Sequence, residues 1–201
     1  MLAFSSLAWY IRVDMAGLHR LGDIAEARFG IHGQPVDRGD FAYIQVKHFN
    51  SYIEIAGKID SWLKADGKVE YHFLQEGDIL FTGKGYRSFA WTYAEEVGPA
   101  VASSIFYVIR PYPEVVIPEF LTLYLNMPQA QQHFAALGAG SSIPSIRKSE
   151  LESISVPVPS LHEQHRLVKL SSLHNEDMRI LRRITDLKQQ LFNEVFQKLI
   201  K

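Results

Sequence analysis

Cysteine is absent from this chain of 201 residues, which excludes disulfides, thiolate zinc sites and a cysteine nucleophile. The absence fits a reducing compartment, and we expect a cytoplasmic protein. Long hydrophobic runs are lacking as well, because the apolar first ten residues have no basic start and run into Arg12 and Asp14. Neither a secretory signal nor a membrane span is therefore expected. With 47% hydrophobic and 21% charged residues, the composition is that of a globular protein that buries a core.

A surplus of positive charge is also missing, since the net charge is -1 at pH 7. The charge is unevenly distributed: residues 161–201 hold eight Lys and Arg against five Asp and Glu, or +3, whereas the preceding residues hold 13 against 17, or -4. Bulk electrostatic attraction therefore cannot be the main source of affinity for nucleic acid. If the part before residue 161 binds DNA, it requires local basic loops or a basic partner.

Glycine and proline are lacking after Ser160. Ser160 and Glu163 have the spacing of a capping box, so we expect one helix from there to Lys201. At 1.5 Å per residue this helix extends roughly 60 Å, far beyond the diameter of a small domain. Apolar residues recur three or four positions apart, as in a coiled coil, and five are predicted to hold a homodimer together: Leu170, Ile184, Leu187, Leu191 and Val195. Two alternatives stay open, namely that this stripe packs on the chain's own domain or on a different half-subunit.

The residues before Ser160 are predicted to form an α+β domain. Strands are indicated by β-branched and aromatic runs at 43–46, 79–81 and 105–109, and by an alternating edge segment at 154–159. Pro118 starts a helix that Pro128 interrupts, and a second helical piece ends at Gly138. A capping box at 149–152 indicates one further short turn.

Six short sequences, in order along the chain, carry a family resemblance. They are LGDIAE at 21–26, YIQVKHF at 43–49, GDILFT at 77–82, PEFLTLYLN at 118–126, GSSIPSI at 140–146 and VPVPSLHEQ at 156–164. Together they resemble the target-recognition half of type I restriction-modification specificity subunits. The first is similar to the family's opening strand and loop, and His48 stands where Asn or Asp is commoner.

The resemblance implies a subunit without a catalytic centre that reads double-stranded DNA and docks separate methyltransferase and restriction subunits. Full-length members contain two such halves in tandem, whereas this chain contains one. The implied architecture is α+β, with a mixed-sheet target-recognition domain over 1–160 and a coiled-coil helix over 161–201 for dimerisation and methyltransferase docking.

DNA contacts are expected from basic residues that follow strand or glycine signals. A loop at 82–88 would allow close backbone approach to phosphate, with lysine attracting phosphate and arginine able to bind a guanine edge. The expected DNA-binding residues are Lys47, His48, Lys84, Tyr86, Arg87, Ser141, Ser142, Arg147 and Lys148. The alternatives are a solvated hairpin tip, an ordinary charged strand end, and a helix cap with its connector.

Other chemistry finds little support in the sequence. Gly83-Lys84-Gly85 is a poor phosphate loop, because five residues rather than four separate Gly77 from Gly83 and no Ser or Thr follows the lysine. His162 and His165 lack zinc-protease spacing and a third ligand nearby. We therefore expect no cofactor, no metal and no enzyme activity. The rival interpretations are an interaction protein, such as an inactive remnant of the same family, and an enzyme with a concave polar site.

Overall fold

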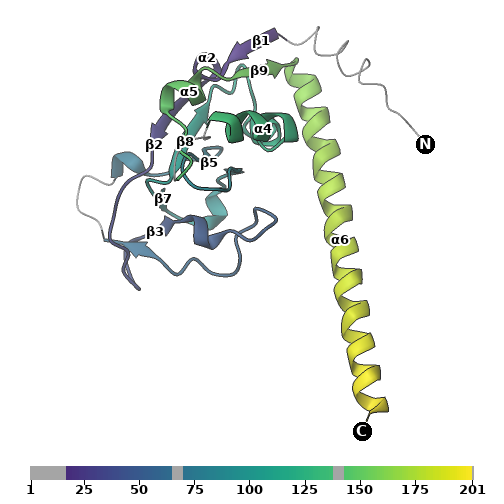
Figure 1. Cartoon of the computed structure of the whole chain (residues 1–201). Coiled ribbons are helices and arrows are strands. Elements are labelled where there is room, and N and C mark those ends of the chain that lie inside the picture. Colours follow the sequence, from purple (N-terminus) through teal and green to yellow (C-terminus); the bar gives the residue numbers. More distant parts are fainter. Residues whose placement is uncertain (1–16, 65–69, 138–142, 201) are drawn as a thin grey trace.

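A computed structural model describes residues 17–64, 70–137 and 143–200, in which strands and short helices pack together and one long helix runs beside them (Figure 1). The strands are β1 (Gly17–Arg20), β2 (Ala25–Phe29), β3 (Phe41–Ile44), β4 (Trp62–Leu63), β5 (Ile79–Thr82), β6 (Ala90–Thr92), β7 (Ala100–Ala102), β8 (Phe106–Pro111) and β9 (Ser155–Val158). The helices are α2 (Leu21–Ile24), α3 (Pro118–Leu125), α4 (Pro128–Leu137), α5 (Lys148–Glu152) and α6 (Leu161–Leu199). Three 3-10 turns complete them: η1 (Val46–His48), η2 (Glu70–His72) and η3 (Glu95–Val97).

The central element is a four-stranded antiparallel sheet in the order β2-β8-β5-β6. Successive side chains of a strand point to opposite sides of a sheet. In the two middle strands, β5 and β8, the side chains on both sides are buried. Ile79, Phe81 and Ile109 pack into one core cluster, and Leu80 and Val108 pack into the other. The strand pair β5 and β8 therefore divides the interior into two hydrophobic cores.

Helices cover the first of these cores. Side chains of α3, α4 and α5 pack there, and the rings of Phe81 and Phe134 lie 4.6 Å apart between their centroids. The short antiparallel pair β1 and β9 contributes Val156 and Val158 to the same cluster. Apolar residues of α3 and α4 face the sheet, and this explains why these short helices are stable.

A three-stranded sheet covers the second core. It has the order β4-β3-β7, with β3 antiparallel to β4 and parallel to β7. Ile44, Ala100 and Ala102 pack there against Phe106 of the central sheet. This second sheet is mixed, so the predicted α+β class with a mixed sheet and a long C-terminal helix is confirmed.

The boundaries of several elements differ from the sequence predictions. The strand predicted at 43–46 ends at Ile44, and Val46–His48 forms a 3-10 turn. The opening strand and loop predicted at 21–26 is wrong, because α2 makes one helical turn there before β2 begins. Short strands such as β4, β6 and β7 were not predicted, since two or three residues hold no readable alternation.

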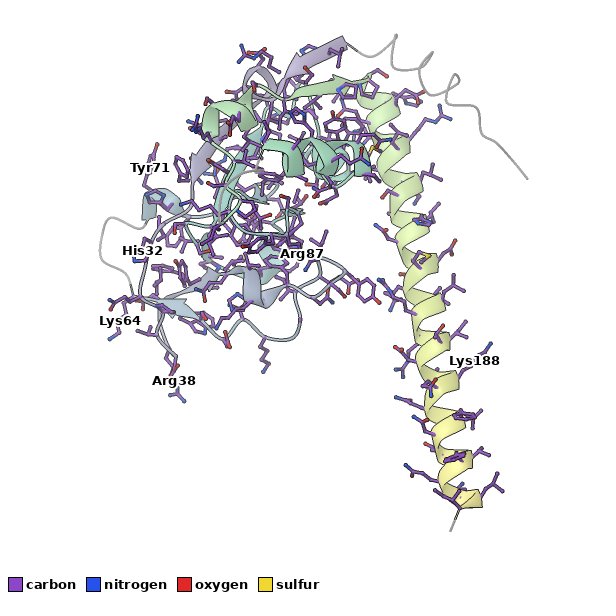
Figure 2. All side chains as sticks on the ribbon, in the orientation of Figure 1. His32, Arg38, Lys64, Tyr71, Arg87 and Lys188 are labelled. Carbon is purple, nitrogen blue, oxygen red and sulfur yellow. The ribbon has the colours of Figure 1, made fainter. Side chains whose placement is uncertain are left out.

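The long helix α6 begins where its sequence predicts. The Ser160 hydroxyl accepts a hydrogen bond from the backbone N–H of Glu163 at 3.3 Å, as an N-cap residue does. Gln164 in the first turn is fully buried and fastens this end to the domain. Its side chain accepts from Ile117 N–H at 2.9 Å and donates to the carbonyls of Val115 and Pro159 at 3.0 and 2.9 Å. The second half of α6 extends beyond the domain, where Figure 2 labels Lys188.

A buried carboxylate joins the strands of the central sheet. Asp78, just before β5, is 1% exposed and receives Nε and Nη2 of Arg110 on β8, both at 2.7 Å. Arg28 on β2 lies 3.5 Å from the same carboxylate, and the backbone N–H of Gln75 donates to it at 2.9 Å. The hydrogen bonds to Asp78 raise the pKa of Arg110. Gly77 precedes it with a φ of +83°, a conformation that favours glycine. The sequence Gly77-Asp78 thus has a structural role.

Replacement of Asp78 should destabilise the fold strongly. In Asp78→Ala, Arg110 and Arg28 lose their shared partner, and breaking a buried ion pair costs about 3 kcal/mol or more. We expect the free energy of unfolding in urea to fall by about this amount. The control Asp37→Ala changes an exposed aspartate and should leave the transition in place. Equal midpoints for the two variants would contradict the structural role of Asp78.

Candidate nucleic-acid interface

Two predicted DNA loops lie side by side. The loop at 82–88 leaves β5 and runs along residues 143–147, with hydrogen bonds of 2.9 Å from Gly85 N–H to Pro144 O and from Ile146 N–H to Gly83 O. Gly83 lies against the Tyr107 ring, and a β-carbon there would approach that ring to 2.3 Å. Backbone pairing therefore brings Lys84 and Arg147, distant in sequence, onto neighbouring segments of one surface.

The side chains of this surface differ in how far they are engaged. Lys84 and Arg147 are exposed, and Tyr86 is 85% exposed. Lys148 forms an ion pair with Glu152 of the same short helix at 3.4 Å. Ser141 and Ser142, which the sequence also predicted, lie outside the described residues. Lys84, Tyr86 and Arg147 are thus the predicted residues that the structure presents together.

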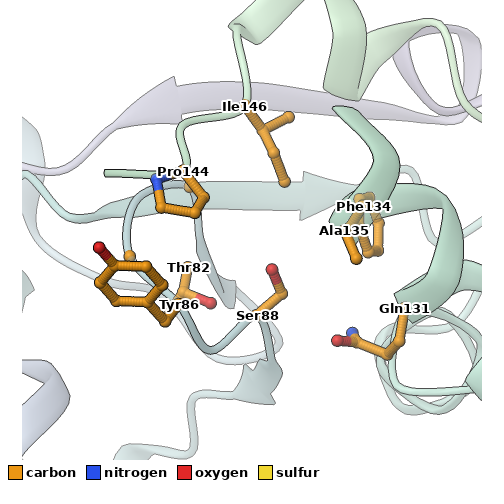
Figure 3. A pocket seen from close by; sticks show the side chains of 10 residues that line it. Thr82, Tyr86, Ser88, Gln131, Phe134, Ala135, Pro144 and Ile146 are labelled. Atoms are coloured by element: carbon orange, nitrogen blue, oxygen red, sulfur yellow. The ribbon is translucent and has the colours of Figure 1, made fainter. Parts of the chain in front are cut away.

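A hollow of about 180 Å³ adjoins this surface (Figure 3). Tyr86 and Pro144 lie on one side of it, and Gln131 and Phe134 of α4 lie on the other. Among the described residues that line it, none is an aspartate, glutamate, histidine, lysine or arginine. A site without such groups offers no general acid or base at neutral pH. The hollow is therefore unlike the polar concave site that the enzyme alternative requires.

Arg87 is engaged within the domain. Its Nη1 donates to the carbonyl of Asn50 at 2.8 Å and its Nη2 to that of Ser51 at 2.9 Å, while the guanidinium lies 5.1 Å from the centroid of the Phe89 ring. A two-bond contact to guanine would require these donors to leave their carbonyls. The arrangement instead makes Arg87 the connection between the loop at 82–88 and the loop that follows η1.

Lys47 and His48 both turn toward Asp60. His48 is 5% exposed, its Nδ1 accepts from Gln45 N–H at 3.0 Å, and its Nε2 lies 2.9 Å from a carboxylate oxygen of Asp60. The acceptor role of Nδ1 places a proton on Nε2, which donates to the carboxylate. Lys47 Nζ lies 2.8 Å from the same oxygen. The expectation that His48 faces DNA from a strand end is corrected by its burial in a 3-10 turn.

Two residues that organise this region had no sequence signal. Asp60 and Asn50 are isolated polar residues, and nothing in their spacing indicates their partners, while Asp78 lies in the GDILFT sequence at 77–82 but without any sign of its arginine partners. Only the long-range contacts of the fold identify them.

The Lys47–Asp60 contact has a measurable effect on ionisation. The ammonium of Lys47 and, after it, the His48 ring hold the pKa of Asp60 well below its usual range. A lowered pKa means that ionised Asp60 favours the folded state above its ordinary pKa, and that this contribution is lost as the pH falls through the lowered value. In Lys47→Met the Asp60 pKa should rise toward its ordinary value, as followed by carboxyl carbon chemical shifts. Lys58→Met is the matched control, and the same Asp60 titration in both variants would refute the contact.

Two further features are absent from the described part of the chain, namely a metal-binding cluster and a membrane-spanning helix. In residues 17–64, 70–137 and 143–200, no three His, Asp or Glu side chains come close enough together to hold a metal ion. Among the described residues, every helix is too short or too polar to span a bilayer.

Comparison with known proteins places the chain in a family. The family model of the type I restriction modification DNA specificity domain matches residues 18–191. The type I restriction enzyme EcoBI specificity subunit of Escherichia coli is 22% identical over 132 residues, which are 62% of this chain and 28% of that protein.

Solved structures show the same fold. The S subunit of a type I restriction-modification system from M. genitalium aligns with a TM-score of 0.58 and 16% identity, over 89% of this chain and 44% of that one. The HsdS subunit from Thermoanaerobacter tengcongensis aligns with a TM-score of 0.58 and 18% identity, over 84% of this chain and 39% of that one. The chain thus spans less than half the length of these relatives. The family model covers nearly the whole of it, from β1 into the last third of α6, and the chain therefore belongs to the family of type I restriction modification DNA specificity domains.

Proposed function

We propose that this chain is a DNA-recognition module of a type I restriction-modification complex, with no catalytic role of its own. The observation that carries the proposal is the paired surface of residues 82–88 and 143–147, which presents Lys84, Tyr86 and Arg147 on hydrogen-bonded backbone in a chain of this family. Lysine attracts phosphate regardless of sequence, while arginine and tyrosine can contact phosphate or base edges. The DNA target depends on which of these side chains reach the bases.

The partners follow from the charge of the domain. The residues before α6 have a net charge of -4, which gives little long-range attraction to DNA. We propose that a methyltransferase subunit supplies the missing phosphate contacts, and that a restriction subunit joins for cleavage. The chain then meets its partners and DNA in the cytoplasm.

Loss of the basic pair should weaken DNA binding in the complex. With methyltransferase present, Lys84→Ala combined with Arg147→Ala should lower the slope of log affinity against log salt by about one for each lost phosphate contact. Lys64→Ala is the control, since Lys64 is exposed at another part of the domain (Figure 2). Fluorescence anisotropy over a salt series measures the slope.

Three results would each contradict a part of the proposal. Unchanged affinity and slope in the double variant would exclude this surface from DNA contact. Tight, specific binding by the purified chain alone would contradict the need for a partner. A chain that shows no DNA preference even in the complex would be an inactive remnant of the family.

The same proposal includes a homodimer through α6. Five apolar residues of the predicted stripe are between 43% and 65% exposed: Leu170, Ile184, Leu187, Leu191 and Val195. These exposed fractions favour a partner helix over packing of the stripe on the chain's own domain. At 3.6 residues per turn, Ile184, Leu187 and Leu191 lie about 140–200° around the helix from Arg182, which contacts the domain. An apolar face pointing away from the domain requires a partner helix.

A second copy suits this face because it carries the same exposed apolar stripe, so a two-fold pair would cover both stripes at once. An antiparallel pair would place identical recognition domains at opposite ends of a helical spacer. Such a dimer favours a palindromic, interrupted DNA site, with half-sites about one helical turn apart.

A charged residue in the stripe should prevent this association. Leu187→Asp or Leu191→Asp should convert the protein to a monomer, because an aspartate at a buried coiled-coil position is desolvated without a partner. Gln190→Asp adds the same charge on the polar face of the same turn and should remain dimeric. Sedimentation equilibrium at micromolar concentration distinguishes them. A monomeric wild type would leave pairing with a different half-subunit as the remaining use of the stripe.

A further inference from the structure

The helix α6 is attached to the domain at two places. The first is its root, where Gln164 is buried among backbone groups. The second is Arg182, which is 18 residues further on and therefore about 27 Å along the axis. One attachment alone would let a helix swing about its root, whereas two attachments fix its direction.

Arg182 is held by the tip of the loop that follows η1. Its guanidinium carbon lies 4.0 Å from the centroid of the Tyr52 ring, and its Nη2 lies 3.5 Å from a carboxylate oxygen of Glu54. An arginine over an aromatic face gains from both stacking and the cation–π attraction. The side chain of Arg182 is 29% exposed, compared with 66% for Arg179 one turn earlier.

The loop at 49–56, here called the brace loop, has a fixed shape. The Asn50 side chain accepts hydrogen bonds from the backbone N–H groups of Tyr52 and Glu54 at 2.8 and 3.0 Å, and donates to the Glu54 carboxylate at 3.1 Å. Ile53 has a φ of +65°, which a β-branched residue adopts only where its surroundings compel it. Its side chain packs against the second core. The brace loop is therefore a preformed support for Arg182.

The brace loop also contacts the proposed DNA surface. Arg87, on the loop at 82–88, donates to the carbonyls of Asn50 and Ser51. A series of direct contacts thus leads from Arg87 through the brace loop to Arg182. The loop at 82–88 and the middle of α6 are connected through the brace loop, away from the root of the helix.

We propose that Arg182, held by Tyr52 and Glu54, is a positioning residue that fixes the inclination of α6 against the domain and so sets the spacing between half-sites. The inference about half-site spacing rests on the proposed function. The contact of Arg182 with Tyr52 and Glu54, here called the brace, does not. The length of α6, which has 39 residues, amplifies a small change in its inclination into a large displacement of its far end. For a helix of about 58 Å, a tilt of about 10° moves its far end by about 10 Å, the length of about three base pairs.

The brace is tested first without DNA. The chain lacks cysteine, so spin labels can be attached at Asp37→Cys and Lys188→Cys in the full-length protein, with labelled chains diluted into unlabelled ones. Pulsed electron–electron double resonance should give one narrow distribution of distances between the two labels when Arg182 is present. Arg182→Ala should broaden it, with about a fivefold fall in the ratio of docked to undocked helix. Glu54→Gln should broaden it less, and Arg182→Lys should restore part of the narrow population.

The control is Arg183→Ala, which removes the adjacent exposed arginine, about 100° around the helix. It should leave the distribution narrow. An Arg182→Ala distribution as narrow as the wild type would overturn the brace, whatever the protein does with DNA.

Spacing is tested next in the complex with methyltransferase. Selection from interrupted palindromes whose spacer varies by single base pairs should give one preferred spacer for the wild type. Arg182→Ala should accept the neighbouring spacers while keeping the same half-site sequence. An unchanged spacer preference with a broadened distance distribution would overturn the link to spacing. A wild type that selects no DNA would instead overturn the proposed function. The distance measurement would still test whether Arg182 fixes the inclination of α6.

Discussion

The ion pairs of Asp78 are the interaction on which the rest of the structure depends. A fully desolvated carboxylate is tolerated only when its charge and its lone pairs are satisfied, and here two arginines and a backbone N–H do this. The arginines come from β2 and β8, so the carboxylate at the start of β5 links three strands of the sheet, in which β8 lies between β2 and β5. Because β5 and β8 divide the two cores, the position of every covering element follows from this arrangement.

Each face of the central sheet supports a different contact with α6. The helix-covered face carries β9 and α3, and these surround Gln164 at the root of α6. The other face carries β3, η1 and the brace loop, which meets α6 again at Arg182. A single sheet thereby positions both ends of the attachment. The direction of α6 is consequently a property of the domain core as well as of the helix.

Several basic side chains of this domain are engaged by groups within the domain itself. Arg110 and Arg28 neutralise Asp78, Lys47 pairs with Asp60, and Arg87 holds the brace loop. The ion pairs with Asp78 and Asp60 reduce the charge left to attract phosphate, whereas the bonds of Arg87 to neutral carbonyls occupy its donors without cancelling its charge. The described part of the domain then presents few cations on its paired loops, which is why the proposed function assigns the remaining phosphate contacts to a partner subunit.

The family and the long helix could be predicted from the sequence because their signals are local. The N-cap at Ser160, the absence of glycine and proline after it and the apolar repeat all act within a few residues of one another. The buried strands β5 and β8 could be predicted for the same reason, because each is rich in β-branched and aromatic residues. Strands of two or three residues and the turn α2 were not, since their conformation depends on the sheets that they join.

The roles of individual polar residues were decided by tertiary structure. Arg87 and His48 belong to basic segments that look alike in the sequence, yet Arg87 meets Asn50 from 37 residues away and His48 meets Asp60 from 12. Arg182 meets Tyr52 across most of the chain. A residue's propensity and periodicity specify its own backbone, whereas its hydrogen-bond partner depends on which distant segment the packed cores bring within about 3 Å.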